Sequence, residues 1–190
     1  MKYSYEEIKN LVEKYMQEED ESPVLIAIDG NCAAGKTTLA ARLQSDLGGN
    51  VFHMDDYYLQ SFQRTRERLR ETGGNVDYER FKKEVIEPLK KGEEVGVYAC
   101  IHPDFVLEYR ETIEYKRLNI IEGSYSCHPY FDSPYKLQIF VKADYELQIE
   151  RIRKRNGEVM LQRFINEWIP KENEYFRKMK IKENCLQIKV

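Results

Sequence analysis

The strongest constraint on the fold comes from residues 30–38, which read Gly-Asn-Cys-Ala-Ala-Gly-Lys-Thr-Thr. They place two glycines, a lysine and a threonine at the spacing G-x-x-x-x-G-K-T. The apolar run 24–28 precedes them, and Leu39, Leu43 and Leu47 follow on one face of a helical pattern. A strand, a glycine loop and a helix in this order are typical of a phosphate-binding loop. The alternative, a glycine-rich turn before an ordinary helix, does not account for all four fixed positions.

The residue types of this loop predict how it binds a nucleotide. Gly30 and Gly35 let the backbone curl so that successive N–H groups point at phosphate oxygens. Lys36 supplies a positive charge for the β- and γ-phosphates, and the Thr37 hydroxyl can bind Mg²⁺. We therefore expect ATP or GTP with Mg²⁺ as the ligand. The expected nucleotide-binding residues are Gly30, Asn31, Cys32, Ala33, Ala34, Gly35, Lys36, Thr37 and Thr38.

Composition and charge narrow the class of protein. The chain has 190 residues, of which 42% are hydrophobic, enough for one domain with a sizeable core. A net charge of −3 and a pI near 5.8 argue against nucleic acid as a partner. No apolar stretch approaches the ~20 residues that cross a bilayer, and the N-terminus lacks a signal peptide's apolar core. We expect a cytoplasmic protein that binds neither nucleic acid nor membranes, and the sequence leaves a homo-oligomer open.

The hydrophobic periodicity predicts strands that alternate with helices. The expected strands are 24–28, 51–54, 95–98, 118–121 and 137–141, and 186–190 read as a last strand or a tail. The expected helices are 4–18, 78–91 with a kink at Pro88, a helix from an Asp144 cap to Arg155, and 158–179 with an interruption at Pro170. Gly157 breaks the pattern, and 60–77 read as a long polar loop. This order predicts an α/β fold with a parallel sheet and helices on both faces, in a single domain over residues 1–190.

Two adjacent acids, Asp55 and Asp56, follow the second expected strand. Open α/β sheets gather their active-site groups at the carboxyl ends of strands. Phosphoryl transfer needs a carboxylate that accepts the proton of the attacking hydroxyl and orients that hydroxyl. Neighbouring side chains of a strand point opposite ways, so we expect only one of the pair to be the base. The alternative is a turn-forming Asp-Asp at a strand end.

Two further charged segments are candidates for the same site, one acidic and one basic. The strand 118–121 ends in Glu122 and Gly123, where a carboxylate can hold Mg²⁺ or its water shell. A basic run from Arg151 to Arg155 precedes Gly157, which suits a lid that closes on the transferred phosphoryl group. Within it we expect Arg153 and Arg155 to act. A solvated loop acid and basic residues at a helix end are the ordinary alternatives.

Together these segments resemble the uridine kinase-like branch of the P-loop kinases, which includes phosphoribulokinase and pantothenate kinase relatives. Residues 53–58, His-Met-Asp-Asp-Tyr-Tyr, are similar to the D-x-[FY]-Y signature of that group, and the resemblance implies Asp55 as catalytic base and Tyr58 as a substrate contact. Residues 74–81 resemble its N-x-D-x-x-x-F segment, which implies acceptor contacts from Asp77 and Arg80. Glu122 and Gly123 match its strand-end E-G pair, and 151–155 match its lid arginines.

The resemblance implies a P-loop NTPase fold with a five-stranded parallel sheet flanked by helices, and a small lid at about residues 151–160. It also implies ATP- or GTP-dependent phosphorylation of a small molecule's hydroxyl, with a nucleoside such as uridine as the leading acceptor. Lys36 and Asp55 are then catalytic together with the lid arginines, and Thr37 and Glu122 bind Mg²⁺. Two alternatives remain: an NTPase or nucleotide-binding switch that acts on a protein partner, and a non-catalytic binder.

Overall fold

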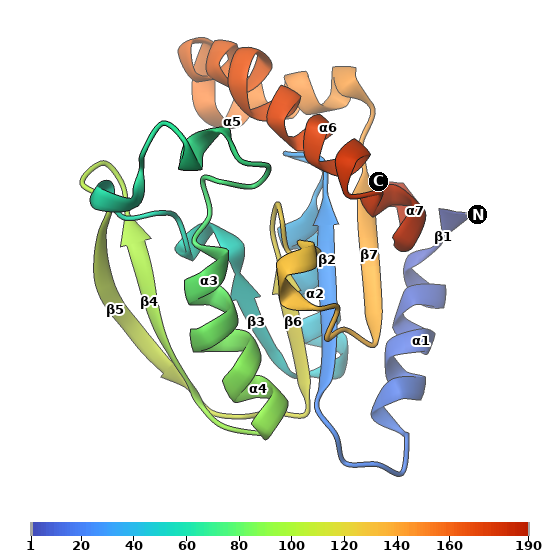
Figure 1. Ribbon diagram of the computed structural model, residues 1–190. Helices are drawn as coiled ribbons and strands as arrows, with labels where there is room; N and C mark the ends of the chain where they lie inside the picture. Colours follow the sequence, from blue (N-terminus) through green and yellow to red (C-terminus); the bar gives the residue numbers. More distant parts are fainter. Residues whose placement is uncertain (1, 190) are drawn as a thin grey trace.

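The computed structural model describes residues 2–189, which form an α/β fold with helices on both faces of a parallel sheet (Figure 1). The strands are β1 (Lys2–Tyr3), β2 (Val24–Gly30), β3 (Asn50–His53), β4 (Val95–Ile101), β5 (Val106–Ile113), β6 (Leu118–Glu122), β7 (Leu137–Lys142) and β8 (Leu186–Lys189). The α-helices are α1 (Tyr5–Met16), α2 (Lys36–Leu47), α3 (Tyr78–Phe81), α4 (Glu87–Lys91), α5 (Tyr145–Arg163), α6 (Ile169–Lys178) and α7 (Ile181–Asn184). No helix among these residues is both long and apolar enough to cross a membrane.

The main sheet of the described residues has six parallel strands in the order β1-β8-β7-β2-β6-β3. The parallel α/β architecture is confirmed, but the strand count of five is wrong. Two short strands, β1 and β8, pair with each other at one edge, whereas residues 95–98 lie outside the sheet. They belong to β4, which pairs antiparallel with β5 in a separate hairpin. Figure 1 shows this hairpin at the left, beside α3 and α4.

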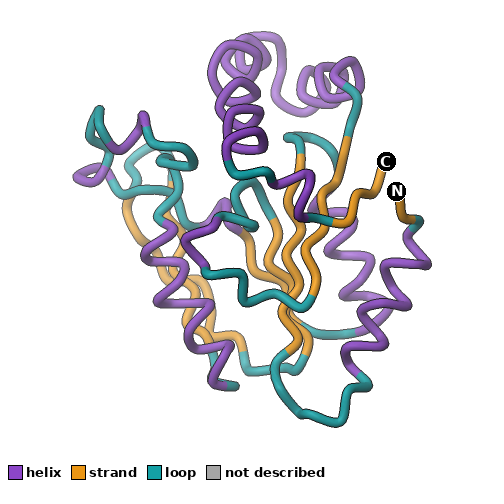
Figure 2. The backbone as a smooth tube through the Cα atoms, turned by 45° about the vertical axis from the view of Figure 1, so that its right-hand side comes forward, coloured by secondary structure: helices purple, strands orange, loops and turns teal. Residues whose placement is uncertain are grey.

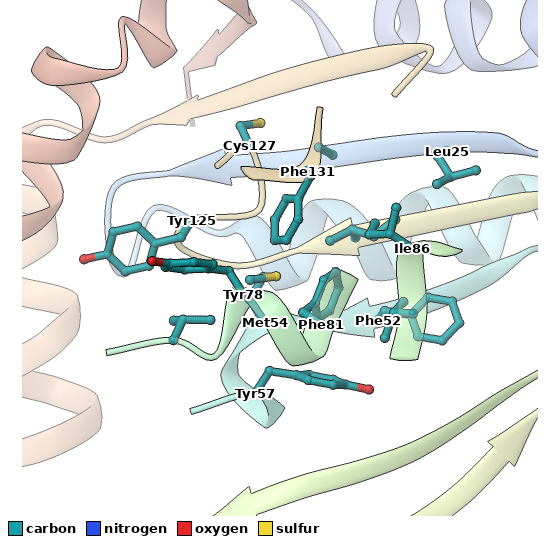
Figure 3. Packing of buried hydrophobic residues seen from close by; sticks show 14 of the residues in the cluster. Leu25, Phe52, Met54, Tyr57, Tyr78, Phe81, Ile86, Tyr125, Cys127 and Phe131 are labelled. Carbon is teal, nitrogen blue, oxygen red and sulfur yellow. The ribbon is translucent and has the colours of Figure 1, made fainter. Parts of the chain in front are cut away.

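The central strand β2 is buried along its whole length, which explains its unbroken apolar run. Because side chains alternate across a strand, Leu25 and Ala27 face one hydrophobic cluster and Ile26 and Ile28 face another. Helices α1 and α2 cover the second cluster. The first cluster lies on the other face, under α3, α4 and α6, and Figure 3 shows part of it.

The helical stretches 78–91 and 158–179 are irregular near a proline, as expected. In each case the irregularity is a π-helical segment, which hydrophobic periodicity does not reveal. A π-helical segment, η4 (Lys82–Ile86), comes just before Pro88, and a second, η6 (Phe164–Trp168), comes just before Pro170. Proline lacks an N–H group and its ring clashes with the carbonyl one turn earlier, and a wider turn relieves that clash. The helices therefore continue through both prolines instead of ending there.

Helices α5 and α6 cross the carboxyl edge of the sheet (Figures 1 and 2). Gly157 interrupts α5 with φ 78° and ψ 171°, a conformation that suits glycine. On the inner side of these helices, Ile152, Leu161 and Phe164 pack with Cys32 of the glycine loop. The segment after β7 therefore lies directly over the loop between β2 and α2.

Candidate active site

The glycine loop joins β2 to α2 and has the backbone that its sequence predicts. Gly30 has φ 140°, and a Cβ atom there would overlap the carbonyl oxygen of Val141 in β7. Gly35 has φ 99° and caps the N-terminus of α2. Only glycine fits these two positions without strain. The loop consequently lies at the positive end of a helix, where backbone N–H groups attract anions.

The side chain of Lys36 points back toward the start of this loop. Its Nζ donates to the carbonyl oxygens of Gly30 and Asn31 at 2.9 and 3.1 Å, and lies 3.4 Å from Oγ of Ser124. The Lys36 side chain is half-buried, and its positive charge lies directly beside the loop backbone. The structure therefore places the Lys36 ammonium at the loop, and its role in phosphate binding stays a prediction.

Thr37 and Glu122, the two expected metal ligands, come together at the end of β6. The Thr37 hydroxyl donates to Oε1 of Glu122 at 3.2 Å, and Nδ1 of His53 lies 2.6 Å from the same oxygen. The other oxygen, Oε2, is buried and has no hydrogen-bond partner among residues 2–189. A buried carboxylate oxygen without a partner, next to a threonine hydroxyl, fits a hard cation such as Mg²⁺. The metal role itself stays a prediction.

Asp55 and Asp56 lie on a 3₁₀ turn, η1 (Met54–Asp56), and not on the strand itself. The two side chains therefore do not point to opposite sides of a strand, as expected from the sequence, because neighbours on a 3₁₀ turn are about 120° apart. Asp55 is exposed, and its Oδ1 accepts from the Tyr58 hydroxyl at 3.1 Å. Asp56 is half-buried, and burial raises the pKa of its carboxyl group. Asp55 is thus the more exposed of the two acids, and its role as catalytic base stays a prediction.

Asp77 and Arg80, the other two expected substrate residues, are buried and strongly bonded within the protein. Asp77 caps α3 by accepting from the backbone N–H of Arg80 at 2.9 Å, and it also accepts from Gln63 at 2.7 Å. The Arg80 guanidinium donates to the carbonyl oxygens of Tyr98 and Asp56 at 2.8 and 3.2 Å. It thereby ties the β4–β5 hairpin to the aspartate turn. A substrate role for the two stays a prediction.

The basic run lies on α5 before the kink at Gly157. Arg151 donates to the carbonyl oxygen of Ala33 in the glycine loop at 3.1 Å. Arg153 is exposed and pairs with Glu158 at 2.8 Å, and Arg155 donates to Oδ1 of Asn156 at 2.7 Å. The structure thus brings Arg151 into contact with the loop, whereas the roles expected of Arg153 and Arg155 stay predictions.

Two buried acids beside the loop were missed by sequence reasoning. Glu172 of α6 accepts from the backbone N–H of Cys32 at 2.9 Å and from the Ser124 hydroxyl at 2.6 Å. Its position between Ile169 and Tyr175, on the inward face of the helix, was the available signal. Asp29 accepts from the backbone N–H groups of Gly30 and Cys127.

Asp29 also accepts from the Tyr175 hydroxyl at 2.8 Å. Complete burial raises the pKa of this carboxyl group to about 6, although hydrogen bonds and Lys36 oppose the shift. The sequence did contain a signal for Asp29, because this acid ends an apolar strand and directly precedes the first glycine of the loop. Both buried acids hold the loop in place by accepting hydrogen bonds from it.

Comparison with solved structures places this geometry among known folds. A candidate fructose transport system kinase from Silicibacter sp. TM1040 matches with a TM-score of 0.75 and 16% identity, over 99% of each chain. A possible uridine kinase from Bacillus stearothermophilus matches with a TM-score of 0.72 and 19% identity, over 95% of this chain and 96% of the other. D-glycerate 3-kinase from Cryptococcus neoformans matches with a TM-score of 0.58 and 12% identity, over 88% and 86%.

No protein-family model matches the sequence, and no curated protein matches it. The structural matches nevertheless cover nearly the whole chain. The protein has the fold of the P-loop kinases. Within that class its resemblance to the uridine kinase-like group, inferred from the sequence, is confirmed at the level of the fold.

Proposed function

We propose that the protein is a kinase that transfers the γ-phosphoryl group of ATP or GTP to a hydroxyl group of a small molecule. The observation that supports this best is the gathering of Lys36, Thr37, Glu122 and Asp55 around the carboxyl ends of β2, β3 and β6. Parallel α/β sheets bind ligands at that edge. The structural neighbours named as small-molecule kinases support the same class of reaction.

In this proposal each side chain has a separate task. Backbone N–H groups of residues 30–38 and the Lys36 ammonium hold the phosphates. Thr37 and Glu122 hold Mg²⁺, which supplies positive charge to the β- and γ-phosphate oxygens when it is bound. Asp55 accepts the proton of the acceptor hydroxyl and orients that hydroxyl in line with the γ-phosphorus.

The lid of the proposed kinase is the stretch of about residues 151–160, on α5. Arg153 and Arg155 would add positive charge to the transferred phosphoryl group, and Gly157, which interrupts the helix, would serve as the hinge of this stretch. The contact of Arg151 with the loop at Ala33 already links the lid to the phosphate site.

The acceptor in this proposal is a nucleoside such as uridine. The motifs at residues 53–58 and 74–81 support it, and so does the neighbour described as a possible uridine kinase. The hydroxyl of Tyr58, which donates a hydrogen bond to Asp55, would contact the acceptor beside this catalytic base. Asp77 and Arg80 would contact the acceptor from the neighbouring helix start, since Arg80 donates to Asp77 through its backbone N–H and to the Asp56 carbonyl through its side chain.

The experiment that tests this function measures ADP formation from Mg-ATP with a panel of acceptors. The panel holds nucleosides, pantothenate, ribulose 5-phosphate, fructose and D-glycerate, and mass spectrometry identifies the phosphorylated product. We expect acceptor-dependent ADP formation that Lys36→Ala abolishes. Equal ADP formation with and without every acceptor would favour the alternative, an NTPase or switch that acts on a protein partner.

A further inference from the structure

His53 ends β3 directly beside Glu122, and the role of its side chain is not explained by the fold. Strands β3 and β6 pair in parallel with His53 opposite Glu122. The side chain of His53 is 44% exposed, whereas that of Glu122 is 6% exposed. The imidazole therefore contributes little to the core, but it makes a close hydrogen bond to a buried carboxylate.

The direction of this hydrogen bond follows from its partners. A carboxylate oxygen can only accept, so the Nδ1 atom of His53 carries the proton and donates to Oε1 of Glu122 across 2.6 Å. Neutral and protonated imidazole both fulfil this condition. The bond therefore holds the carboxylate whichever form of the ring is present.

The two oxygens of Glu122 consequently have different surroundings. Oε1 accepts from His53 and from the Thr37 hydroxyl. Oε2 is buried and has no hydrogen-bond partner among the described residues. Two donors on one oxygen fix the rotation of the carboxylate about its last bond. They leave the other oxygen free for a ligand.

We propose that His53 is a positioning residue for a divalent cation: it orients Glu122 so that Oε2 faces the metal beside Thr37. This inference rests on the proposed nucleotide and Mg²⁺ site. Carboxylates that bind metals are commonly held by outer hydrogen bonds, and loss of such a bond typically costs about 10- to 100-fold in metal affinity. His53 would act on the metal through Glu122 and would not touch the metal itself.

The test measures equilibrium binding of a fluorescent ATP analogue in EDTA and across a series of MgCl₂ concentrations. The variants are His53→Ala, which removes the donor, and His53→Asn, whose side-chain amide keeps an N–H group at the position of Nδ1. A matched control is His102→Ala, because His102 is an exposed histidine of the β4–β5 hairpin and packs edge-to-face against Phe105.

We expect His53→Ala to raise the MgCl₂ concentration at half-saturation by about tenfold or more, with unchanged affinity in EDTA. His53→Asn should recover most of the loss, and His102→Ala should behave as wild type. An unchanged Mg²⁺ response in His53→Ala overturns the inference. An equal loss with and without Mg²⁺ also overturns it, because His53 would then support the loop in general. If the wild-type protein does not bind the analogue at all, that result contradicts the proposed function, and the inference about His53 falls with the proposed function.

Discussion

The hydroxyl of Thr37 donates to Oε1 of Glu122 across 3.2 Å, which joins the first turn of α2 to the carboxyl end of β6. These residues are 85 positions apart in the sequence, and the parallel pairing of β2 with β6 brings them together. The contact places a hydroxyl and a carboxylate, both suitable ligands for Mg²⁺, at the mouth of the glycine loop.

Glu122→Gln should raise the Mg²⁺ requirement and lower turnover. The amide oxygen can still accept from Thr37 and His53, so the shape is kept, but the charge that attracts the cation is lost. Initial rates across a series of MgCl₂ concentrations measure the effect. If the concentration at half-maximal rate is the same as in wild type, Glu122 is only an acid at a strand end.

Asp55→Asn should lower kcat by about 10²- to 10⁴-fold, the usual range for loss of a general base, with little change in ATP affinity. Asp56→Asn is the matched neighbour and should do much less, because Asp56 is half-buried whereas Asp55 is exposed beside Tyr58. Kinetics with the acceptor identified by the panel decide between them. If Asp56→Asn is the inactive variant, the catalytic base is Asp56 and not Asp55. If both variants keep full activity, the proposed mechanism is wrong.

Arg153→Ala and Arg155→Ala should each lower kcat by about 10²-fold, since in the proposed mechanism each variant removes a cation that would stabilise the transferred phosphoryl group. Lys154→Ala is the control, because Lys154 is an exposed cation on the same turn of α5. Single-turnover rates at saturating ATP separate this effect from binding. Wild-type rates in both arginine variants would confine the lid's role to Arg151, the arginine that contacts the loop.

The sequence predicts the centre of this protein much better than its edges. Residues 24–38 combine a buried strand, two obligatory glycines and a helix start, and each feature has its own local signal. Glu122 is predictable because it directly follows an apolar strand. The strand β1 is two residues long, too short for a periodic pattern to appear, whereas β8 lies within the stretch 186–190 that the sequence left open as a strand or a tail.

Other features depend on contacts between distant segments, and the local pattern alone does not decide them. Residues 95–98 look like a strand of the main sheet, because periodicity reports a buried face but not the pairing partner. Their partner β5 is mostly exposed and polar, so it has no buried face to detect. Glu172 and Asp29 are charged residues at buried positions, where a hydrophobic pattern predicts apolar side chains.

The raised pKa of Asp29 gives a pH dependence of stability with a definite sign. Burial raises this pKa from its usual 3.8 to about 6, so between these values the folded protein keeps a proton that the unfolded chain loses. The contribution of Asp29 to stability is therefore full below about pH 4 and falls as the pH rises to about 6. We expect the free energy of unfolding of wild type, minus that of Asp29→Asn, to fall over this range. A constant or rising difference in denaturant titrations would show that Asp29 is ionised throughout.

The central claim, that residues 30–38 bind the phosphates of a nucleoside triphosphate, is tested most directly by the ATP affinity of Lys36→Ala. The hydrogen bonds of Lys36 go to the carbonyl oxygens of Gly30 and Asn31 and to Ser124, and its side chain is only half-buried, so the variant should stay folded, with an unfolding temperature close to that of wild type. Isothermal titration with Mg-ATP should show binding to wild type and a loss of most of that affinity in Lys36→Ala. Equal affinity of a well-folded Lys36→Ala protein would contradict the assignment of the loop, and with it the kinase proposal.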